Sequence, residues 1–527
     1  MPQLPLSRKN MGKNTPHVPL LLPRPAIFDL PERVIQFGTG VLLRGLCDYF
    51  IDEANRQGLF NGRIVVVKST DQGDAAAFEA QNGLFTHVIR GLVNDQPVEE
   101  YRVNAAISRT LSARSQWADV LACAHNPELQ IVISNTTEVG IQLVEDESLT
   151  AQPPVSFPGK LTCFLYERWK AFGGSEASGL VIVPTELIPD NGIRLQEICL
   201  ELAYRGGLDV AFIDWLETAN RFCNSLVDRI VPGKPNPTEL AAYEQQLGYR
   251  DNLLCVSEVY RLWAIEAPAD ASGERVKAIL SFAQADEGVL LAPDIEIYRE
   301  LKLRLLNGTH TLTCALNYLS GCDTVRQSMK RALNAGFAER LMLDELAPSI
   351  PYAVDASTAE AFGRQVLERF RNPFLEHKLL SITTNYTTKL RMRVVSLVQS
   401  YYARFTQTDP SDRPEDLSLG FAAYLLFMKA IHEENGRFSG ERNGEPYAIQ
   451  DEAAGWFADW WQRDGEVTEV LAHTDFWETD LSKLPGFSDC IQDYLTALQE
   501  NGVNAVLEQR LSAMAEKVVV QSYTKFE

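Results

Sequence analysis

The chain has 527 residues, of which 45% are hydrophobic, and this length exceeds what a single hydrophobic core usually serves. We therefore expect two large domains. The formal net charge of −21 excludes a surface that follows nucleic-acid phosphates, because such a surface needs clustered Lys and Arg. No nucleic-acid partner is expected, and a small anionic substrate would need its own local basic pocket.

The cysteines and histidines are scattered along the chain. The nine cysteines form no Cys-x-x-Cys pair, and neither they nor the seven histidines show the spacing of zinc ligands. This pattern predicts thiols in a reducing compartment and no metal site. No apolar run approaches the roughly 20 residues of a membrane span, and the sequence shows no signal-peptide pattern. We expect a cytoplasmic protein without a membrane partner.

Residues 1–30 are rich in Pro and basic residues and show no periodicity, which predicts an N-terminal arm that is flexible or laid over the surface. Residues 31–290 then alternate short apolar runs with amphipathic stretches. The runs RVIQFG, RIVVVKS, LQIVISN and GLVIVPTE suit parallel strands that are buried on both faces. This alternation predicts a doubly wound, Rossmann-like α/β domain that binds NAD.

The β-type runs disappear after about residue 290, and long helical patterns take their place. Examples are AEAFGRQVLERF, LGFAAYLLFMKAIHEE and AGWFADWWQRDGEVTEVLAHT. We expect residues 291–527 to form a mostly α-helical substrate or catalytic domain.

The first predicted strand runs directly into Gly38-Thr-Gly40-Val-Leu-Leu-Arg44, and a helix-like segment follows. Glycines at such a turn let the backbone approach a pyrophosphate, and the start of a helix supplies free N–H groups. A Gly-x-Gly pair by itself is equally typical of an ordinary strand-to-helix turn. Its position in the first βα turn favours a dinucleotide site.

Two further strand ends carry polar residues that suit the same cofactor. Asp71 follows the second strand, where a carboxylate can accept hydrogen bonds from the adenosine ribose and favours NAD over NADP. Lys68 is the competing residue, since its ammonium could hold a 2′-phosphate. Asn135, Thr136 and Glu138 follow a later strand at the predicted ligand-binding edge of the sheet, although polar turn residues are also expected there on structural grounds.

The segment from Tyr298 to His310 carries a candidate chemical site. At about 100° per residue, Lys302, Asn307 and His310 fall within an arc of about 140°, and leucines cluster on the opposite side. Reduction of a ketone needs a proton donor at the carbonyl oxygen, and a desolvated lysine can be that donor. Asn307 could donate a hydrogen bond to the developing alkoxide, and His310 could orient a substrate hydroxyl. On spacing alone, a solvated helix face remains the commoner explanation.

Four motifs occur in the order that one known family shows. They are Gly38-x-Gly40-x3-Arg44, Thr137-Glu138-x-Gly140, Asn224-Ser225-x-Val227-Asp228-Arg229-Ile230 and Lys302-x4-Asn307-x2-His310. Together they resemble the mannitol dehydrogenase family of polyol-specific long-chain dehydrogenases, and the likeness runs from about Arg33 to near the C-terminus.

This resemblance implies a Rossmann-like domain followed by a helical domain, with the active site between them. It implies NAD chemistry without a metal, in which Lys302 is the general acid/base. It also implies that Asp71 lies at the adenosine ribose and that Asp228 and Lys389 lie near the substrate.

Within the family, the chain most resembles members that interconvert tagaturonate and altronate. The stretches that carry this likeness include GLFTHVIRGL, NSLVDRIVPG and GERNGEPYAIQD. Mannitol- and mannonate-type members are expected to have a motif similar to Ser-Cys-Asp-Asn-x3-Asn-Gly after one strand. This chain has Pro184-Thr-Glu-Leu187-Ile-Pro-Asp-Asn191-Gly192 there, so Leu187 takes the place of the first Asn. A leucine cannot donate a hydrogen bond, which leaves Asn307 as the clear carbonyl-polarising group. Glu186 or Asn191 could compensate, although structural roles at a strand end are favoured for both.

A sugar acid carries a carboxylate, and the planar guanidinium of arginine matches a carboxylate best. The basic candidates for this contact are Arg369, Arg371, Lys389, Arg391 and Arg393. For each arginine, an ordinary surface role is the alternative.

The leading hypothesis is NADH-dependent, reversible reduction of tagaturonate, a small sugar acid, to altronate. A mannitol-, arabinitol- or mannonate-type dehydrogenase of the same family is the nearest alternative. A non-catalytic NAD-binding sensor is the alternative from another class, but such a protein has no chemical use for Lys302, Asn307 and His310. The sequence does not indicate an oligomeric state.

Overall fold

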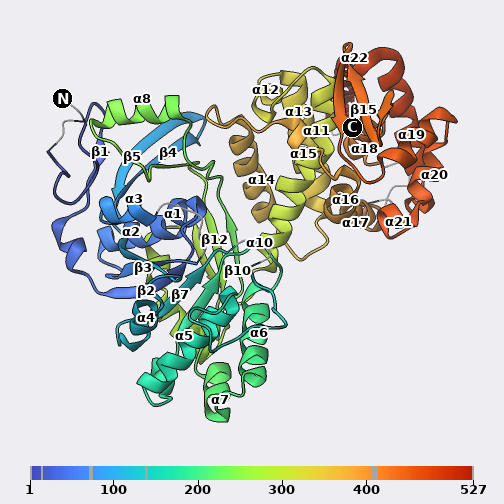
Figure 1. The fold of residues 1–527 in the computed structure, drawn as a ribbon. Helices are drawn as coiled ribbons and strands as arrows, with labels where there is room; N and C mark the ends of the chain where they lie inside the picture. Colours follow the sequence, from blue (N-terminus) through green and yellow to red (C-terminus); the bar gives the residue numbers. More distant parts are fainter. Residues whose placement is uncertain (1–2, 14–15, 70–74, 137–139, 406–412, 525–527) are drawn as a thin grey trace. The chain divides into compact units, whose positions relative to one another are not determined.

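The computed structural model describes residues 3–13, 16–69, 75–136, 140–405 and 413–524. It divides into two compact units, Met1–Ile295 and Glu296–Glu527 (Figure 1). The sequence pattern changes from β-type runs to helical patterns near residue 290, which is close to this division.

The first unit is built on a six-stranded parallel sheet with the order β6-β3-β2-β7-β8-β9. Its strands are β2 (Glu32–Phe37), β3 (Arg63–Lys68), β6 (Ile107–Ser112), β7 (Ile131–Ser134), β8 (Val181–Pro184) and β9 (Arg221–Phe222). This is the strand order of Rossmann domains, and it reverses between β2 and β7. The predicted strands RVIQFG, RIVVVKS, LQIVISN and GLVIVPTE are therefore confirmed.

The sheet is buried on both faces, which explains why its strands are continuously apolar. Val34 and Ile35 of β2 point to opposite sides and belong to two separate hydrophobic cores. Helices α4 to α7 cover one face (Figure 1), and α2 and α9 pack on the other. The helices of this unit are α1 (Val41–Gly45), α2 (Cys47–Gln57), α3 (Ala75–Ala80), α4 (Trp117–Ala122), α5 (Phe157–Ala171), α6 (Asn191–Arg205), α7 (Val210–Thr218), α8 (Pro237–Leu247) and α9 (Ala271–Ile279).

Two smaller sheets complete the first unit, and the sequence patterns did not predict them. One has the order β1-β5-β4-β11, and the other has the order β10-β12-β13. Their strands are β1 (Leu20–Leu21), β4 (Phe85–Val93), β5 (Gln96–Asn104), β10 (Ser225–Asp228), β11 (Cys255–Ser257), β12 (Leu262–Glu266) and β13 (Val289–Ala292). The β4–β5 hairpin turns at Asn94 and Asp95, which both adopt positive φ as a tight hairpin turn requires.

The described part of the N-terminal segment lies over the second sheet. Strand β1 pairs with β5, and Pro5 forms a β-bridge with Arg250. Leu6 is only 2% exposed within the hydrophobic core of that sheet. The segment is therefore laid over the surface, which is one of the two states expected for residues 1–30.

The second unit is mostly helical, as predicted. Its α-helices are α10 (Glu296–Leu301), α11 (Thr309–Leu319), α12 (Val325–Met329), α13 (Ala332–Arg340), α14 (Ala356–Arg371), α15 (Leu379–Ile382), α16 (Tyr386–Leu390), α17 (Ser396–Arg404), α18 (Glu415–Phe427), α19 (Ala454–Gln462), α20 (Val467–Ala472), α21 (Thr474–Trp477) and α22 (Phe487–Thr524). The segments η5 (Lys302–Gly308), η6 (Leu341–Leu346) and η8 (Arg391–Val395) are π-helical. Helix α18 is buried around its whole circumference and forms the centre of this unit.

The expectation that β structure ends near residue 290 is wrong for one segment. An antiparallel meander of β14 (His432–Glu434), β15 (Arg437–Arg442) and β16 (Glu445–Ile449) follows α18. Its two turns are Asn435-Gly436 and Asn443-Gly444, and all four residues have positive φ. Asn-Gly is the strongest short-range hairpin signal, so the sequence did contain the information.

Among the described residues, no helix combines the length and the hydrophobicity that crossing a membrane requires.

Candidate active site

The turn after β2 depends on Gly38. Its φ of +134° lies in a region that side chains rarely adopt, and its N–H donates to the Val67 carbonyl oxygen at 3.0 Å. A Cβ at this position would lie 2.8 Å from the carbonyl oxygen of Asn135, at the end of β7. Gly38 therefore lets β2 and β7 meet closely where the strand order reverses.

Gly40 differs from Gly38, because no described residue packs against it closely enough to require a glycine. Its φ is −61°, an ordinary value, and an added Cβ would meet no atom of the described residues within 4 Å. The space above Gly40 lies at the carboxyl end of β2, beside the reversal of strand order, where dinucleotides bind in this fold. The turn therefore fits a pyrophosphate that approaches the backbone from outside.

Arg44 lies beneath this turn and is 7% exposed. Its guanidinium donates to the carbonyl oxygen of Thr39 at 2.7 Å and lies over the ring of Phe78. Burial raises the pKa of the neighbouring Asp48 to about 8, although Arg44 opposes that shift. Asp48 is then largely protonated at neutral pH, so the charge of Arg44 is not neutralised by it. Arg44 braces the turn and adds a positive field there, and direct contact with NAD stays a prediction.

Asn135 and Thr136 are both anchored at the same edge of the sheet. The Asn135 amide donates to the Thr185 hydroxyl at 2.9 Å, and Thr136 donates from its N–H and its hydroxyl to Glu186 at 2.8 and 2.9 Å. Ser134 also donates to Glu186, which is 2% exposed. Burial raises the pKa of Glu186, and these hydrogen bonds oppose the shift. Glu186 thus has the structural role favoured from the sequence.

Asn191 is a candidate substrate residue from the sequence, and in the structure its side chain is bonded to backbone groups. It is 1% exposed, and its amide donates to the carbonyl oxygens of Pro184, Glu186 and Ser225 at 3.0 to 3.1 Å. Its own oxygen accepts from the Ser225 N–H at 2.9 Å. With every polar atom engaged by backbone, Asn191 ties the start of α6 to β8 and β10. Leu187 is 54% exposed and cannot replace it as a donor.

Asp228 ends β10 and is 7% exposed, with its backbone paired to Leu262. The next residue, Arg229, belongs to the same sequence motif, Asn224 to Ile230, and the sequence alone indicates no role for it. Its guanidinium donates to the Gly45 carbonyl oxygen at 2.6 Å and to the Glu258 carbonyl oxygen at 2.8 Å. Arg229 therefore fixes the motif that contains Asp228 against the end of helix α1. Asp71 and Glu138, both predicted to bind NAD, lie outside the described residues.

In the second unit, Lys302 and Asn307 lie in the π-helix η5, which changes their predicted geometry. Hydrogen bonds from i to i+5 reduce the rotation to roughly 80° per residue, compared with about 100° in an α-helix. Lys302, Asn307 and His310 then fall within an arc of roughly 80°, instead of the predicted 140°. All three are half-buried, whereas Leu305 and Leu312 on the other side are fully buried.

Arg304 holds this π-helix against another π-helix, η8. It pairs with Glu300 at 2.9 Å, and its Nη1 donates to the carbonyl oxygens of Met392 and Arg393 at 2.8 and 3.0 Å. These carbonyl groups belong to η8. A single buried guanidinium thus joins the segment that carries Lys302 to the segment that carries Arg393.

His310 lies among aromatic and basic groups. Its ring stacks on Phe370 with a centroid distance of 4.2 Å and meets the exposed ring of His377 edge to face at 5.0 Å. Loss of solvation, followed by the charges of His377, Arg369 and Arg393, lowers the pKa of His310 well below its ordinary value. His310 is therefore neutral at physiological pH, so one ring nitrogen can donate a hydrogen bond and the other can accept one.

The structure separates the basic candidates for a carboxylate contact. Arg371 pairs with Glu339 at 4.0 Å, and Arg391 pairs with Glu478 at 3.5 Å. Arg369, Lys389 and Arg393 instead cluster near His310. Lys389 donates to the Ile382 carbonyl oxygen at 2.8 Å, and Arg393 donates to the Thr311 hydroxyl at 3.0 Å. Arg369 is 8% exposed in the last turn of α14.

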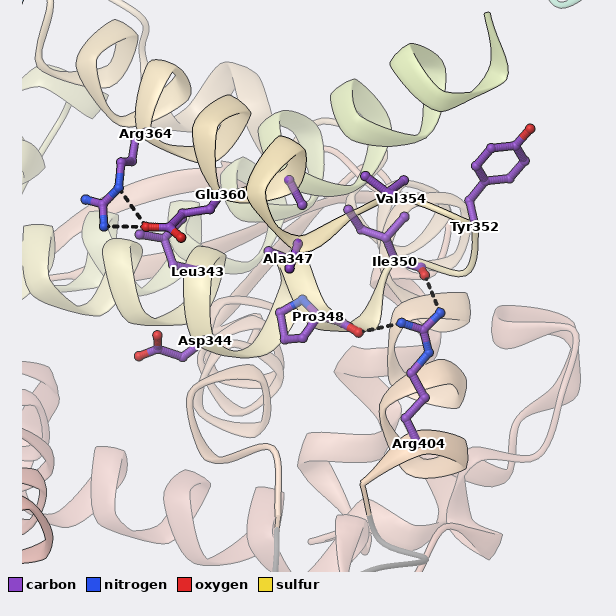
Figure 2. A pocket seen from close by; sticks show the side chains of 12 residues that line it. Leu343, Asp344, Ala347, Pro348, Ile350, Tyr352, Val354, Glu360, Arg364 and Arg404 are labelled. Atoms are coloured by element: carbon purple, nitrogen blue, oxygen red, sulfur yellow. Dashed lines mark hydrogen bonds and ion pairs between the residues drawn. The ribbon is translucent and has the colours of Figure 1, made fainter. Parts of the chain in front are cut away.

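A hollow of about 460 Å³ in the second unit lies apart from these residues (Figure 2). It is lined mainly by apolar side chains of η6, the following loop and α14, and Arg404 donates across it to the carbonyl oxygens of Pro348 and Ile350. None of the predicted site residues lines it. Nowhere in the described ranges do three or more His, Cys, Asp or Glu side chains gather as a metal site would need.

Two family models match the chain. The mannitol dehydrogenase Rossmann domain matches residues 32–277, and the mannitol dehydrogenase C-terminal domain matches residues 294–499. The chain belongs to the mannitol dehydrogenase family. This membership confirms the predicted family, its fold and its reaction class, an NAD-dependent oxidoreductase that acts on a CH–OH group.

Relatives within the mannitol dehydrogenase family cover nearly the whole chain. It is 37% identical over 491 residues to altronate oxidoreductase of Halalkalibacterium halodurans, with coverage of 91% of this chain and 93% of the relative. It is 37% identical over 496 residues to altronate oxidoreductase of Pectobacterium carotovorum, with coverage of 91% and 96%. The fold is also that of Pseudomonas fluorescens mannitol 2-dehydrogenase in its complex with NAD and D-mannitol, with a TM-score of 0.65, 22% identity, and coverage of 97% of this chain and 100% of that one.

We expect Gly40→Ala to weaken NADH binding about tenfold while the free energy of unfolding stays within about 0.5 kcal/mol of wild type. The added methyl group meets no atom of the residues that the structure describes but would occupy space above the turn. Gly38→Ala is the matched control and should reduce both quantities, because its Cβ would clash with Asn135. Fluorescence titration with NADH and denaturant unfolding measure the two effects. Unchanged NADH affinity in Gly40→Ala would contradict a pyrophosphate at this turn.

The lowered pKa of His310 predicts a pH dependence of stability. The unfolded chain binds a proton at this residue below about pH 6.5, whereas the folded protein does not. Stability is therefore lost as the pH falls from about 6.5 toward the folded pKa, by up to about 1.4 kcal/mol per pH unit. His310→Gln should remove this contribution and lose less stability than wild type between about pH 7 and pH 5. Identical pH profiles from denaturant unfolding would show that His310 titrates normally.

Proposed function

We propose that this protein catalyses the reversible, NAD(H)-dependent interconversion of tagaturonate and altronate, with Lys302 as the general acid/base and without a metal. The observation that carries the proposal is the 37% identity to two altronate oxidoreductases over 91% of the chain. Identity to a structure named for mannitol is lower, at 22%. Leu187 stands where the mannitol and mannonate types resemble Asn, and it therefore also favours the tagaturonate type over the mannonate type.

The side chains of η5 and α11 have complementary chemical roles in this proposal. When bound, NADH supplies the hydride that reaches the keto carbon. Lys302 donates a proton to the carbonyl oxygen as the alkoxide develops, and Asn307 donates a hydrogen bond to the same oxygen. Neutral His310 orients a neighbouring hydroxyl of the substrate. In the oxidative direction, the same lysine accepts the proton from the alcohol.

We further propose that the enzyme works in a reducing compartment, the cytoplasm. All nine cysteines are free thiols in the structure, and burial raises the pKa of Cys47, Cys199 and Cys314, so these thiols are poor nucleophiles. The rival within the family is a mannitol-, arabinitol- or mannonate-type dehydrogenase. The rival from another class is an NAD-binding sensor without catalysis.

A steady-state panel separates these functions. With NADH as the reductant, we expect tagaturonate to give the highest kcat/KM, and with NAD we expect altronate to exceed mannitol, arabinitol and mannonate. Turnover of fructose without turnover of tagaturonate would assign the protein to the mannitol type. NADH binding without turnover of any compound would favour the sensor.

Lys302→Ala is expected to lower kcat by about 10²- to 10⁴-fold while NADH affinity stays unchanged, because the variant loses proton transfer but keeps the first unit intact. Lys330→Ala, which removes an exposed lysine of the same unit, is the control and should keep wild-type kinetics. Presteady-state measurement of NADH oxidation gives the chemical rate directly. A wild-type rate in Lys302→Ala would remove this lysine from the mechanism.

A further inference from the structure

Lys389 and Arg393 form a pair of neighbouring cations that no acid balances in the part of the chain that the structure describes. They are separated by one helical turn, and each makes one hydrogen bond to a neutral oxygen, of Ile382 and of Thr311 respectively. Burial lowers the pKa of Arg393 and, with the charge of Arg393, that of Lys389. Both cations have therefore lost part of their solvation without gaining a counter-charge.

Other arginines of the same region do have acidic partners. Arg304 pairs with Glu300, Arg371 pairs with Glu339, and Arg391 pairs with Glu478. Arg391 lies in the same π-helix as Arg393, two residues before it. In a chain with a net charge of −21, acids to pair with are abundant. The lack of one beside Lys389 and Arg393 among the described residues therefore favours an anion that comes from outside the chain.

Hydrogen bonds place Arg393 close to the proposed reaction site. Its Nη1 donates to the hydroxyl of Thr311 at 3.0 Å, and that hydroxyl donates to the carbonyl oxygen of Asn307 at 2.7 Å. Thr311 directly follows His310, whose pKa is depressed partly by Arg393. One hydroxyl group thus separates the guanidinium from the backbone of the residue proposed to polarise the carbonyl.

The surrounding backbone holds Arg393 in this position. The buried Arg304 donates to the carbonyl oxygens of Met392 and Arg393, and the hydroxyl of Tyr386 donates to the carbonyl oxygen of Thr311 at 2.7 Å. Tyr386 is fully buried. A preorganised donor loses little conformational freedom when it binds an anion, which strengthens the contact.

We propose that Arg393, supported by Lys389, binds the carboxylate of the sugar acid and so determines the preference of the enzyme for uronates over neutral ketoses. A guanidinium matches a carboxylate with two parallel hydrogen bonds, and Nη1 is the only one of its nitrogens with a hydrogen bond to a described residue. The carboxylate of tagaturonate lies at the end of its carbon chain opposite the keto carbon. It therefore needs a binding group that is near the reacting carbonyl group but does not touch it, as Arg393 is. This inference rests on the proposed function.

The test compares tagaturonate with the matching ketose, in which a hydroxymethyl group replaces the carboxylate. For Arg393→Leu, we expect the ratio of the two kcat/KM values to fall about 100-fold, because the charged contact is lost for only one substrate. Arg393→Lys keeps the charge but loses the planar fork, so an intermediate fall of about tenfold is expected. Arg391→Leu removes an arginine of the same π-helix that pairs with Glu478, and it should keep the wild-type ratio.

An unchanged ratio in a folded Arg393→Leu protein would overturn the inference, and NADH affinity and thermal unfolding establish that the protein is folded. If Arg393→Leu does not fold, the same ratio of kcat/KM values is measured for Arg393→Lys, and an unchanged ratio in that variant would overturn the inference. A fall of the same size in Arg391→Leu would also overturn the inference, since the effect would then reflect general charge.

Failure of the proposed function gives a different result. If wild type neither reduces tagaturonate nor oxidises altronate, that function is wrong, and the carboxylate site is decided by calorimetric binding of gluconate, an acyclic sugar acid. Binding that is at least about tenfold weaker in Arg393→Leu than in wild type would support the site. Equal affinities, or no binding to either protein, would overturn it.

Discussion

The π-helical turn at Lys302–Gly308 is the constraint on which the candidate substrate site depends. A π-helix is rare and occurs mostly as a single turn within an α-helix, so this longer segment needs support from tertiary structure. Arg304 provides that support by binding the carbonyl groups of the facing π-helix. The result is that Lys302, Asn307 and His310 share one narrow face, while leucines of the same segment fill the core. Local strain in the helix is thus compensated by one buried arginine.

In the first unit, buried arginines also hold the turn after β2, at Gly38 to Gly40, where we expect the cofactor to bind. Gly38 allows β2 and β7 to approach where the strand order reverses, and Gly40 leaves space that no described residue fills. Arg44 and Arg229 brace the turn from below through the carbonyl oxygens of Thr39 and Gly45. In both units, therefore, buried arginines bind backbone carbonyl groups and hold a strained segment in place. Arg44, Arg229 and Arg304 can therefore affect ligand binding without contacting a ligand.

The sequence predicted the features that follow from repeated local patterns. The four parallel strands, the mostly helical second unit and the family could all be predicted, because each rests on several independent segments. The smaller sheets were missed because polar residues interrupt the apolar pattern of the nine-residue strands β4 and β5, although Asn94-Asp95 marked their turn. The π-helix was missed because α and π spacing differ only slightly over a few residues, and the bonding of Arg304 cannot be seen in the sequence.

Single polar residues were the hardest to assign from sequence. Asn191 resembled a substrate residue by position, but its amide ties three backbone segments together, a role that becomes visible only when β8, α6 and β10 are assembled. The arginines of η8 and of the end of α14 looked equivalent in the sequence. Only the structure distinguishes Arg391 and Arg371, which have acids of their own, from Arg393. Partners distant in sequence decide such roles, and local patterns do not contain them.

The chain divides into two compact units, and this division has an evolutionary consequence. The groups that suit the cofactor lie in the first unit, and most of those that we propose to distinguish substrates lie on η5, η8 and α11 of the second. Mutations that alter the accepted sugar can therefore accumulate in one unit while the dinucleotide fold stays under its own selection. A lineage can diversify its carbon sources by changing a few side chains on one helical scaffold, with its redox machinery inherited intact.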